Sequence, residues 1–255
     1  VKRDDCTGLG MGGNKARQLE FFFGDALARG ADTVLITGAV QSNYVRATAA
    51  ASAKLGMGCE IQLEERVEGM DETYRRSGNV LLNQLFGARL HSYPEGEDET
   101  GADAELDAIA ERLRSQGKSP YVIYLSEGHQ PLGALGYVEA AGEILEQAAV
   151  LGADFDAIVV PSGSGATHAG LLVGLRAAGS KVPVHGISVR RDAKSQAARI
   201  LRTARATGEE LEVAHVVDET DIVVHDDWLA PGYGHPSEDT LEAIKIAAQR
   251  EGLLL

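Results

Sequence analysis

The sequence has little cysteine and no long apolar run, and each shortage excludes a class of protein. Cys6 and Cys59 are the only cysteines among 255 residues, too few for a disulfide scaffold and typical of a reducing compartment. No apolar run approaches the roughly 20 residues that a membrane helix needs. We therefore expect a cytoplasmic protein with no membrane partner.

Basic residues are also scarce. The chain has 24 Lys and Arg against 38 Asp and Glu, a formal net charge of −14. Because this charge repels a polyanion, we expect no nucleic-acid partner. Seven histidines are scattered without ligand spacing, so we expect no metal site. Apolar residues make up 44%, which is enough to offset the entropy of ordering and excludes a disordered chain.

Short, β-branched apolar runs alternate with glycine-rich turns and amphipathic, alanine-rich stretches. Strands are predicted at residues 33–37, 59–63, 89–93, 121–125, 157–160 and 184–189. Helices are predicted at residues 43–55, 71–86, 103–116, 132–149, 166–178, 192–207 and 237–251. Apolar strands alternating with helices favour parallel sheets covered on both faces. We therefore predict an α/β fold of open, mostly parallel sheets flanked by helices.

Ligands of such sheets bind at the carboxyl ends of the strands. Three loops therefore need attention, at residues 38–43, 125–132 and 161–168. A fourth loop, residues 95–99, is acidic, and we interpret it as a solvated linker rather than a metal site.

Residues 161–168 read Pro-Ser-Gly-Ser-Gly-Ala-Thr-His, between an apolar strand and an Ala/Leu-rich helix. Small residues let backbone N–H groups approach an anion, and the helix N-terminus adds partial positive charge. A dinucleotide fingerprint would need glycine at His168, and a P-loop would need Gly-Lys-Ser/Thr. A phosphate monoester cofactor fits best. A glycine turn without a ligand is one alternative, and an NADP-binding module using Arg190 and Arg191 is another.

Lys15 follows a run of small, turn-forming residues and opens a helix whose apolar face contains Leu19, Phe22 and Phe23. A lone lysine is usually solvated at the surface. The positive end of a helix lowers the pKa of an amine, however, and makes it more nucleophilic. We therefore predict a Schiff-base lysine.

Residues 38–44 end a strand with polar side chains. Ser42 or Asn43 is a suitable cap for the helix that follows, and capping is compatible with any role in ligand binding. This segment would lie at the same sheet edge as the glycine-rich loop at residues 161–168.

Five motifs carry a resemblance to a known family. In order, they lie at residues 1–20, 41–43, 132–137, 162–171 and 230–234. With them the whole chain resembles the pyridoxal-phosphate enzymes of the D-cysteine desulfhydrase and 1-aminocyclopropane-1-carboxylate deaminase family. The resemblance implies a tryptophan synthase β-like fold (fold type II) and a homodimer.

The resemblance also implies two domains. Residues 1–36 and 137–255 would form the larger, cofactor-binding domain, and residues 37–136 the smaller α/β domain. The chain starts with Val1 and ends with three leucines. Because the family has further segments at both ends, we expect that this sequence is part of a longer chain.

Roles for individual residues follow from the same resemblance. Lys15 would hold pyridoxal 5′-phosphate covalently, and Asn43 would hydrogen-bond the 3′-oxygen of the cofactor. Ser42 would handle the substrate carboxylate or Cα proton, and Tyr233 would stack or transfer protons near the ring. The phosphate would be cradled by Ser164, Gly165, Ala166 and Thr167. Substrate would contact Ser42, Asn43, Tyr44, His129 and Tyr233.

The implied reaction is α,β-elimination from a small β-substituted amino acid, releasing pyruvate and ammonia. The best match is D-cysteine, which would also release hydrogen sulfide. Tyr233 is flanked by Gly232 and Gly234 rather than by the acidic residue of the deaminases, which disfavours ring opening. Tyr44 stands where desulfhydrases usually have histidine. The alternatives are 1-aminocyclopropane-1-carboxylate deaminase, cysteate sulfo-lyase and a non-catalytic paralogue that binds pyridoxal phosphate.

Overall fold

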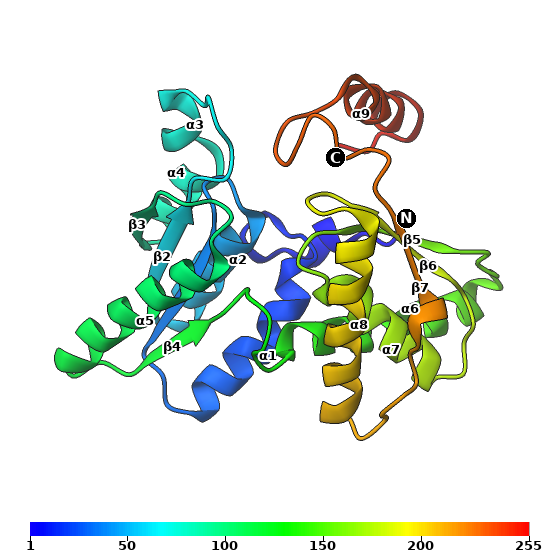
Figure 1. Ribbon diagram of the computed structural model, residues 1–255, viewed down its shortest axis with the longest axis horizontal. Helices are drawn as coiled ribbons and strands as arrows, with labels where there is room; N and C mark the ends of the chain where they lie inside the picture. Colours follow the sequence, from blue (N-terminus) through cyan, green and yellow to red (C-terminus); the bar gives the residue numbers. More distant parts are fainter. Residues whose placement is uncertain (255) are drawn as a thin grey trace.

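The computed structural model describes residues 1–254. Its strands are β1 (Thr33–Ala39), β2 (Gly58–Glu64), β3 (Arg89–Tyr93), β4 (Pro120–Ile123), β5 (Ile158–Ser162), β6 (Val184–Ser188) and β7 (Ile222–His225). They form two sheets that lie side by side (Figure 1), one in the order β3-β2-β1-β4 and the other in the order β5-β6-β7. All strand pairs within them are parallel. The predicted fold class is therefore confirmed.

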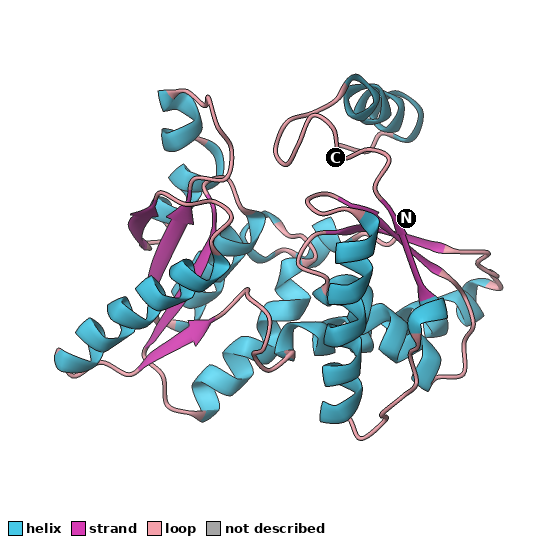
Figure 2. Cartoon of the chain, in the orientation of Figure 1, coloured by secondary structure: helices cyan, strands magenta, loops and turns pink. Residues whose placement is uncertain are grey.

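The helices connect the strands and cover the sheets (Figure 2). They are α1 (Lys15–Ala28), α2 (Asn43–Leu55), α3 (Glu72–Arg76), α4 (Gly78–Leu85), α5 (Glu99–Ser115), α6 (Leu132–Leu151), α7 (Ala166–Ala177), α8 (Ala193–Glu210) and α9 (Glu238–Glu251). The single helix predicted at residues 71–86 is divided into α3 and α4 at Ser77, whose backbone is extended, and Gly78 follows with a φ of 57°. Strand β7 lies outside the predicted strands. No helix within residues 1–254 is long and apolar enough to cross a lipid bilayer.

Strand β1 forms the centre of the four-stranded sheet, and all seven of its residues are buried. Ile36 packs in a cluster with Leu19 and Phe23 of α1, whereas Leu35 faces Leu106 of α5 on the other side. Each fully buried aliphatic side chain contributes about 1.5–3 kcal/mol, so this strand anchors the first sheet. Helices cover both of its faces, as predicted.

The three-stranded sheet differs from that expectation. Val184 of β6 packs in one cluster with Leu172 of α7 and Ile200 of α8, so these helices cover one face. On the opposite face Val159 is 65% exposed. Within the described residues, coverage of both faces was therefore a wrong prediction for this sheet.

The division into two domains stays a prediction, but one of its boundaries needs a change. The boundary between residues 36 and 37 falls inside β1, and every residue of β1 pairs with β2. The strand therefore belongs wholly to the first sheet. Helix α1 lies between the two sheets and contacts α2 on one side and α6 on the other.

Glycines allow three helices to approach closely beneath the second sheet. A Cβ atom on Gly170 of α7 would lie 2.2 Å from the carbonyl oxygen of Ala134 in α6. A Cβ on Gly136 of α6 would lie 2.1 Å from the carbonyl oxygen of Arg17 in α1. We call this contact of α1, α6 and α7 the glycine seam. It fixes the start of α7, where the predicted phosphate loop ends.

Candidate cofactor site

A cavity of about 220 Å³ lies at the carboxyl ends of β1, β5 and β6. Of the predicted site residues, its wall contains Lys15, Ser42, Tyr44, Ser164, Gly165, Thr167 and Tyr233. Asn43, Ala166 and His129 are not part of this wall. The fold thus brings the predicted lysine and the predicted phosphate loop together, although they are far apart in the sequence.

Lys15 is the first residue of α1 and is partly buried. Its Nζ lies 5.4 Å from the centroid of the Tyr44 ring. Burial lowers the pKa of the amine to about 8, because desolvation penalises the charged form. Among residues 1–254 it makes no side-chain hydrogen bond or ion pair. A neutral amine with a free lone pair is suited to nucleophilic attack on a carbonyl carbon.

The backbone before Lys15 is tightly turned. Gly10, Gly12 and Gly13 have φ values of 50°, 71° and 110°, a region that suits glycine. A Cβ on Gly12 would lie 1.9 Å from the carbonyl oxygen of Asp5, so no other residue fits there without backbone movement. This turn places the lysine at the mouth of the cavity.

Asp4 ties this turn to the rest of the molecule. The backbone N–H of Gly13 donates to the Asp4 carbonyl at 2.8 Å. The Asp4 carboxylate accepts from Arg17 Nε at 2.9 Å and from the Tyr137 hydroxyl at 2.5 Å. Arg17 Nη1 also donates to Glu143 Oε2 at 2.7 Å, and this bond, with one from Lys2, lowers the pKa of Glu143 to about 2. These hydrogen bonds therefore connect the N-terminal segment before and at the start of α1 to α6.

The glycine-rich loop after β5 has the features of an anion cradle. Gly165 caps α7 with a φ of 96° and no side-chain hydrogen bond, so the first N–H groups of the helix have no helical partner. The Gly163 carbonyl accepts from Gln196 Nε2 at 3.0 Å, and the Ser164 carbonyl accepts from Arg199 Nε at 2.9 Å. Because C=O and N–H point oppositely in a trans peptide, the N–H groups of this loop point away from α8.

Thr167 connects the loop to α1. Its Oγ1 accepts from Asn14 Nδ2 at 3.2 Å and from Gln18 Nε2 at 3.0 Å. Both partners are donors here, so the hydroxyl hydrogen remains available for an acceptor. Thr167 can therefore donate to an anion in the cavity.

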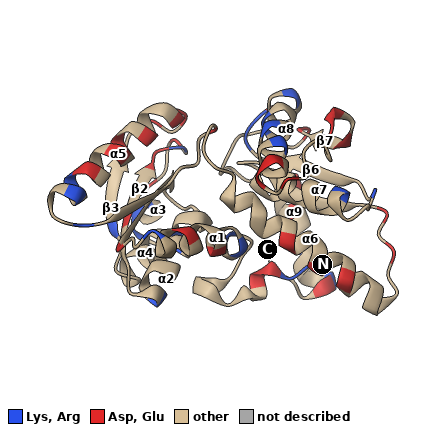
Figure 3. Cartoon of the chain, turned by 90° about the horizontal axis from the view of Figure 1, so that it is seen from below, with Lys and Arg blue, Asp and Glu red and all other residues tan. Residues whose placement is uncertain are grey.

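Arginine side chains form part of the cavity wall, at Arg66, Arg190 and Arg199. Glu99, at the start of α5, pairs with Arg190 at 3.2 Å and Arg199 at 3.1 Å, and also with Arg191 at 2.7 Å. Figure 3 shows basic residues on α8 and acidic residues along α5. These pairs join the two halves of the molecule, and carboxylates match the charges of the wall arginines, with Arg66 paired to Glu64 at 2.7 Å.

The acidic loop before α5 is exposed, as expected of a solvated segment, and the Glu97 side chain is 72% exposed although it pairs with Arg190 at 2.6 Å. Glu99 differs, because it is the first residue of α5 and pairs with three arginines. The NADP alternative required Arg190 and Arg191 as phosphate ligands. Their charges are instead matched by Glu97 and Glu99 within the protein.

Ser42 and Tyr233 approach the cavity from opposite halves of the chain. Ser42 caps α2, and its Oγ accepts from the backbone N–H of Tyr44 at 3.1 Å. Tyr233 follows β7, on a segment where Gly234 leaves no room for a Cβ, which would lie 2.7 Å from Val67. This close approach to the first half places the Tyr233 ring in the cavity wall.

His168 stands where a dinucleotide fingerprint would have its third glycine. The ring is fully buried, and burial lowers its pKa to about 4. It fills the space beside Gly186, where a Cβ would lie 2.4 Å from His168 Nδ1. The histidine is therefore a neutral part of the core between α7 and β6, and a glycine at this position would leave a hole.

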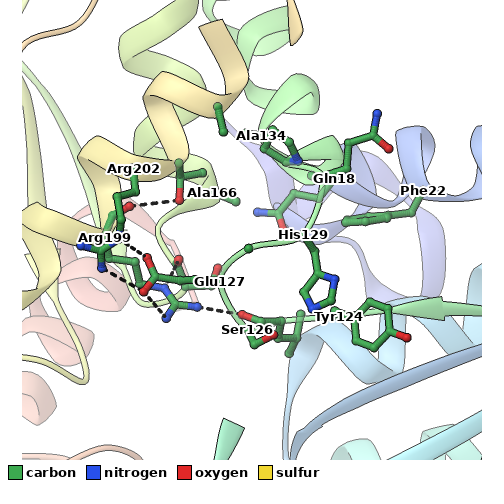
Figure 4. A pocket seen from close by; sticks show the side chains of 18 of the residues that line it. Gln18, Phe22, Tyr124, Ser126, Glu127, His129, Ala134, Ala166, Arg199 and Arg202 are labelled. Atoms are coloured by element: carbon green, nitrogen blue, oxygen red, sulfur yellow. Dashed lines mark hydrogen bonds and ion pairs between the residues drawn. The ribbon is translucent and has the colours of Figure 1, made fainter. Parts of the chain in front are cut away.

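His129 belongs to a second pocket of about 310 Å³. The two pockets share Tyr44, Leu125, Ser164 and Arg199. His129 stacks on Tyr124 with ring centroids 4.0 Å apart, as Figure 4 shows. Ala166 also lies in this second wall. His129 therefore lines the neighbouring pocket and not the cavity of Lys15, and its contact with substrate stays a prediction.

The loop at residues 126–131 encloses that second pocket. Glu127 receives two hydrogen bonds of 2.9 Å from Arg202 of α8, and these lower the pKa of its carboxyl group. At the other end, His129 Nε2 lies 3.4 Å from Asp103 Oδ2 of α5. The loop therefore connects α5 with α8.

A phosphorylated aldehyde fits the first cavity. The uncapped N–H groups at Gly165 and the free Thr167 hydroxyl suit a phosphate, and the unpaired amine of Lys15 suits the aldehyde. Asn43 lies next to this wall, and its Oδ1 accepts from Asn79 Nδ2 at 2.9 Å and from Arg46 Nη2 at 3.3 Å. Sequence reasoning missed both partners, although Arg46 is the only charged residue in the first three turns of α2.

Comparison with known proteins supports this chemistry. The family model "Pyridoxal-phosphate dependent enzyme" matches residues 1–255. A D-cysteine desulfhydrase of Klebsiella pneumoniae subsp. pneumoniae is 44% identical over 255 residues, which is 100% of this chain and 75% of the relative. The crystal structure of an "ACC deaminase homologue" has a TM-score of 0.85 at 37% identity and covers 100% of this chain and 73% of its own.

More distant structures share the fold alone. The crystal structure of a T.th. threonine deaminase has a TM-score of 0.63 at 20% identity, covering 98% of this chain and 75% of its own. With a family model that matches the whole sequence and relatives that share nearly half of its residues, this chain belongs to the pyridoxal-phosphate dependent enzyme family.

Proposed function

We propose that this protein is a lyase that converts D-cysteine and water into pyruvate, hydrogen sulfide and ammonia. The observation that carries the proposal is one cavity lined by both Lys15 and Gly165. At Gly165 the first backbone N–H groups of α7 have no side-chain cap. The name of the Klebsiella pneumoniae relatives, D-cysteine desulfhydrase, supports this substrate. The low exposure of Tyr44, 7%, supports a small amino acid, because the ring restricts space beside the amine.

The cofactor and Lys15 have separate roles in this reaction. When bound, pyridoxal phosphate supplies an electron sink that stabilises negative charge at the substrate Cα. Lys15 accepts the Cα proton at Nζ, which its lowered pKa favours near pH 8. The Cβ–S bond breaks with its electron pair on sulfur, and sulfur leaves with a proton as hydrogen sulfide. Water then replaces the nitrogen of the three-carbon product, which gives pyruvate and ammonia.

Other side chains bind and orient the cofactor and the substrate. The N–H groups at Gly165 and the hydroxyls of Ser164 and Thr167 would hold the phosphate, and Asn43 would donate to the 3′-oxygen. Ser42 Oγ binds the substrate carboxylate at the N-terminus of α2, where the helix dipole favours negative charge. Tyr233, from the other half of the chain, lines the same cavity and would stack on the cofactor ring or transfer protons beside it.

The alternatives differ in their substrate. Gly232 and Gly234 flank Tyr233 and provide no carboxylate for ring opening, so the deaminase activity is disfavoured. Cysteate sulfo-lyase would use the same residues with a sulfonate leaving group. We also propose that the enzyme is a cytoplasmic homodimer. The free thiols of Cys6 and Cys59 support a reducing compartment.

The test combines absorbance with product analysis. The purified protein is incubated with pyridoxal phosphate, its visible absorbance is recorded, and pyruvate and sulfide are measured with D-cysteine. We expect a yellow protein that releases both products, and Lys15→Ala abolishes the visible band and turnover. Lys54→Ala, at the exposed end of α2, serves as the control and retains both. A yellow but inert protein would identify the non-catalytic paralogue, and pyruvate only from another β-substituted alanine would overturn the substrate.

A further inference from the structure

The side-chain amide of Asn43 is held in one orientation by its neighbours. Arg46 Nη2 donates to the Asn43 oxygen at 3.3 Å, and a guanidinium group has donors only. The end of Asn43 that faces Arg46 must therefore be the oxygen. Its nitrogen, Nδ2, makes no hydrogen bond within residues 1–254 and remains free to donate to a ligand.

Asn79 fixes the same orientation independently. Its Nδ2 donates to the Gln41 carbonyl at 2.7 Å and to Asn43 Oδ1 at 2.9 Å. A backbone carbonyl can only accept, so the nitrogen of Asn79 must lie between the two oxygens. The backbone N–H of Asn79 also donates to Gln41 Oε1 at 2.8 Å, which anchors the start of α4 to the loop after β1.

Arg46 has a second set of contacts, with the turn that precedes Lys15. Its Nη1 donates to the Gly10 carbonyl and its Nη2 to the Gly12 carbonyl, the latter at 3.3 Å. The residue is only 6% exposed, and burial lowers its pKa. One buried guanidinium group therefore contacts both Asn43 and the turn that carries the lysine.

From this geometry we propose that Arg46 and Asn79 are positioning residues for the cofactor. Together they hold Asn43 with its N–H group toward the 3′-oxygen, and Arg46 also holds the turn before Lys15. The inference rests on the proposed function, which assigns Asn43 to the cofactor. Neither residue touches the cofactor, since both act through Asn43 or the turn.

The direction of the effect follows from hydrogen-bond chemistry. The 3′-oxygen of the cofactor is an acceptor when ionised, and a flipped Asn43 would present an oxygen to it. A hydrogen bond to a charged group contributes about 1.5–3 kcal/mol, so its loss weakens cofactor binding by about tenfold to a hundredfold.

The experiment uses Asn79→Asp, which keeps the shape of the side chain but replaces the donor by an acceptor. The dissociation constant of pyridoxal phosphate is measured by titration of the visible absorbance. We expect binding to weaken by about tenfold or more. We also expect the same change to have less than about a threefold effect in an Asn43→Ala background, because Asn79 acts through Asn43.

Arg46 is tested by Arg46→Met and Arg46→Lys in the same titration. The lysine retains one cationic donor and recovers part of the affinity that the methionine loses. Arg176→Met is the matched control, because Arg176 also donates to backbone carbonyls, those of Ser180 and Val182, but lies at the distal end of α7. It lowers stability without changing the dissociation constant.

The outcomes separate this inference from the proposed function. If the parent protein fails to bind pyridoxal phosphate, or Asn43→Ala binds it as the parent does, the assignment of Asn43 itself fails. If Asn43→Ala weakens binding while Asn79→Asp and Arg46→Met bind as the parent does, only the positioning role is overturned. Equal losses for Asn79→Asp in both backgrounds would also overturn it.

Discussion

The Lys15 amine lies 5.4 Å from the centroid of the Tyr44 ring, and Tyr44 lines both pockets whereas Lys15 lines only the first. A ring face attracts a cation by roughly 0.5–2 kcal/mol, which would raise the pKa of the amine. The pKa is instead lowered to about 8, so desolvation outweighs that attraction. We expect the Tyr44 ring to contribute to this desolvation by keeping water from the amine.

Tyr44→Ala is therefore expected to raise the pKa of Lys15 towards its ordinary value of 10.5. Loss of the buried ring also destabilises the fold by roughly 3–5 kcal/mol. The rate of amine modification as a function of pH measures the first effect, and urea unfolding measures the second. Tyr44→Phe retains the ring and is the control, with the pKa of Lys15 unchanged. An unchanged pKa in Tyr44→Ala would show that another wall desolvates the amine.

The lowered pKa of Lys15 also makes stability depend on pH. Between about pH 8 and 10.5 the unfolded chain holds more protons on this lysine than the folded one, so stability rises with pH in that window. Below it the folded state bears the full cost of a buried charge. We expect Lys15→Met to stabilise the cofactor-free protein at pH 7 and to lose this advantage at pH 10.5, as urea midpoints would show. Lys54→Met is the control for loss of one positive charge. The same difference in urea midpoint between Lys15→Met and the parent at both pH values would contradict the prediction.

Glu99 is expected to stabilise the contact between the two halves. Glu99→Gln removes the carboxylate that Arg191 and Arg199 share and leaves Arg199 with only the more distant Glu127, at 3.9 Å. Removal of one partner from a buried ion pair costs roughly 3–5 kcal/mol, and the Glu99 side chain is 25% exposed, so we expect about 1–3 kcal/mol. Glu72→Gln is the control, because its pair with Arg76 is about 75% exposed and contributes at most about 0.5 kcal/mol. Equal urea midpoints for the two variants would rule out a stabilising role for Glu99.

The glycine seam is expected to tolerate no side chain. In Gly170→Ala the new methyl group meets the Ala134 carbonyl at 2.2 Å, and overpacking of this kind costs about 1–3 kcal/mol. Gly142→Ala, on the open side of α6 with nothing within 4 Å, is expected to stabilise by about 0.5–1 kcal/mol. Thermal unfolding of the two variants compares them directly. A Gly170→Ala variant as stable as the parent would show that α6 and α7 can move apart.

Much of the fold followed from local pattern. The helix predicted at residues 43–55 coincides with α2, and the strand predicted at residues 89–93 coincides with β3. Both could be predicted because the spacing of apolar residues and the positions of turn residues are local features of the sequence. Strand β7 has only four residues and is bordered by Asp221 and Asp226. Its β-branched run at residues 222–224 is a local strand signal, but pairing with β6 fixes its place in the sheet.

Some features of the candidate site were likewise visible in the sequence, and others were not. Lys15 and the loop at Gly165 were predictable because a helix start and a glycine turn are visible in the sequence. The contacts of Arg46 with Gly10 and of Glu99 with Arg199 join residues far apart in the chain, and only the fold creates them. His129 illustrates the same limit, since its stacking on Tyr124 places it in the second pocket.

The glycine seam and the loop at residues 126–131 respond to sequence change in opposite ways. The seam fixes the phosphate loop through backbone contacts that even one methyl group disrupts. The loop at residues 126–131 borders the neighbouring pocket, and its Glu127 and His129 side chains pair with Arg202 and Asp103. We therefore expect substitutions in this loop to reshape the second pocket while the glycine-rich loop at residues 161–168 stays in place. Substrate preference could then change by small steps without loss of cofactor binding.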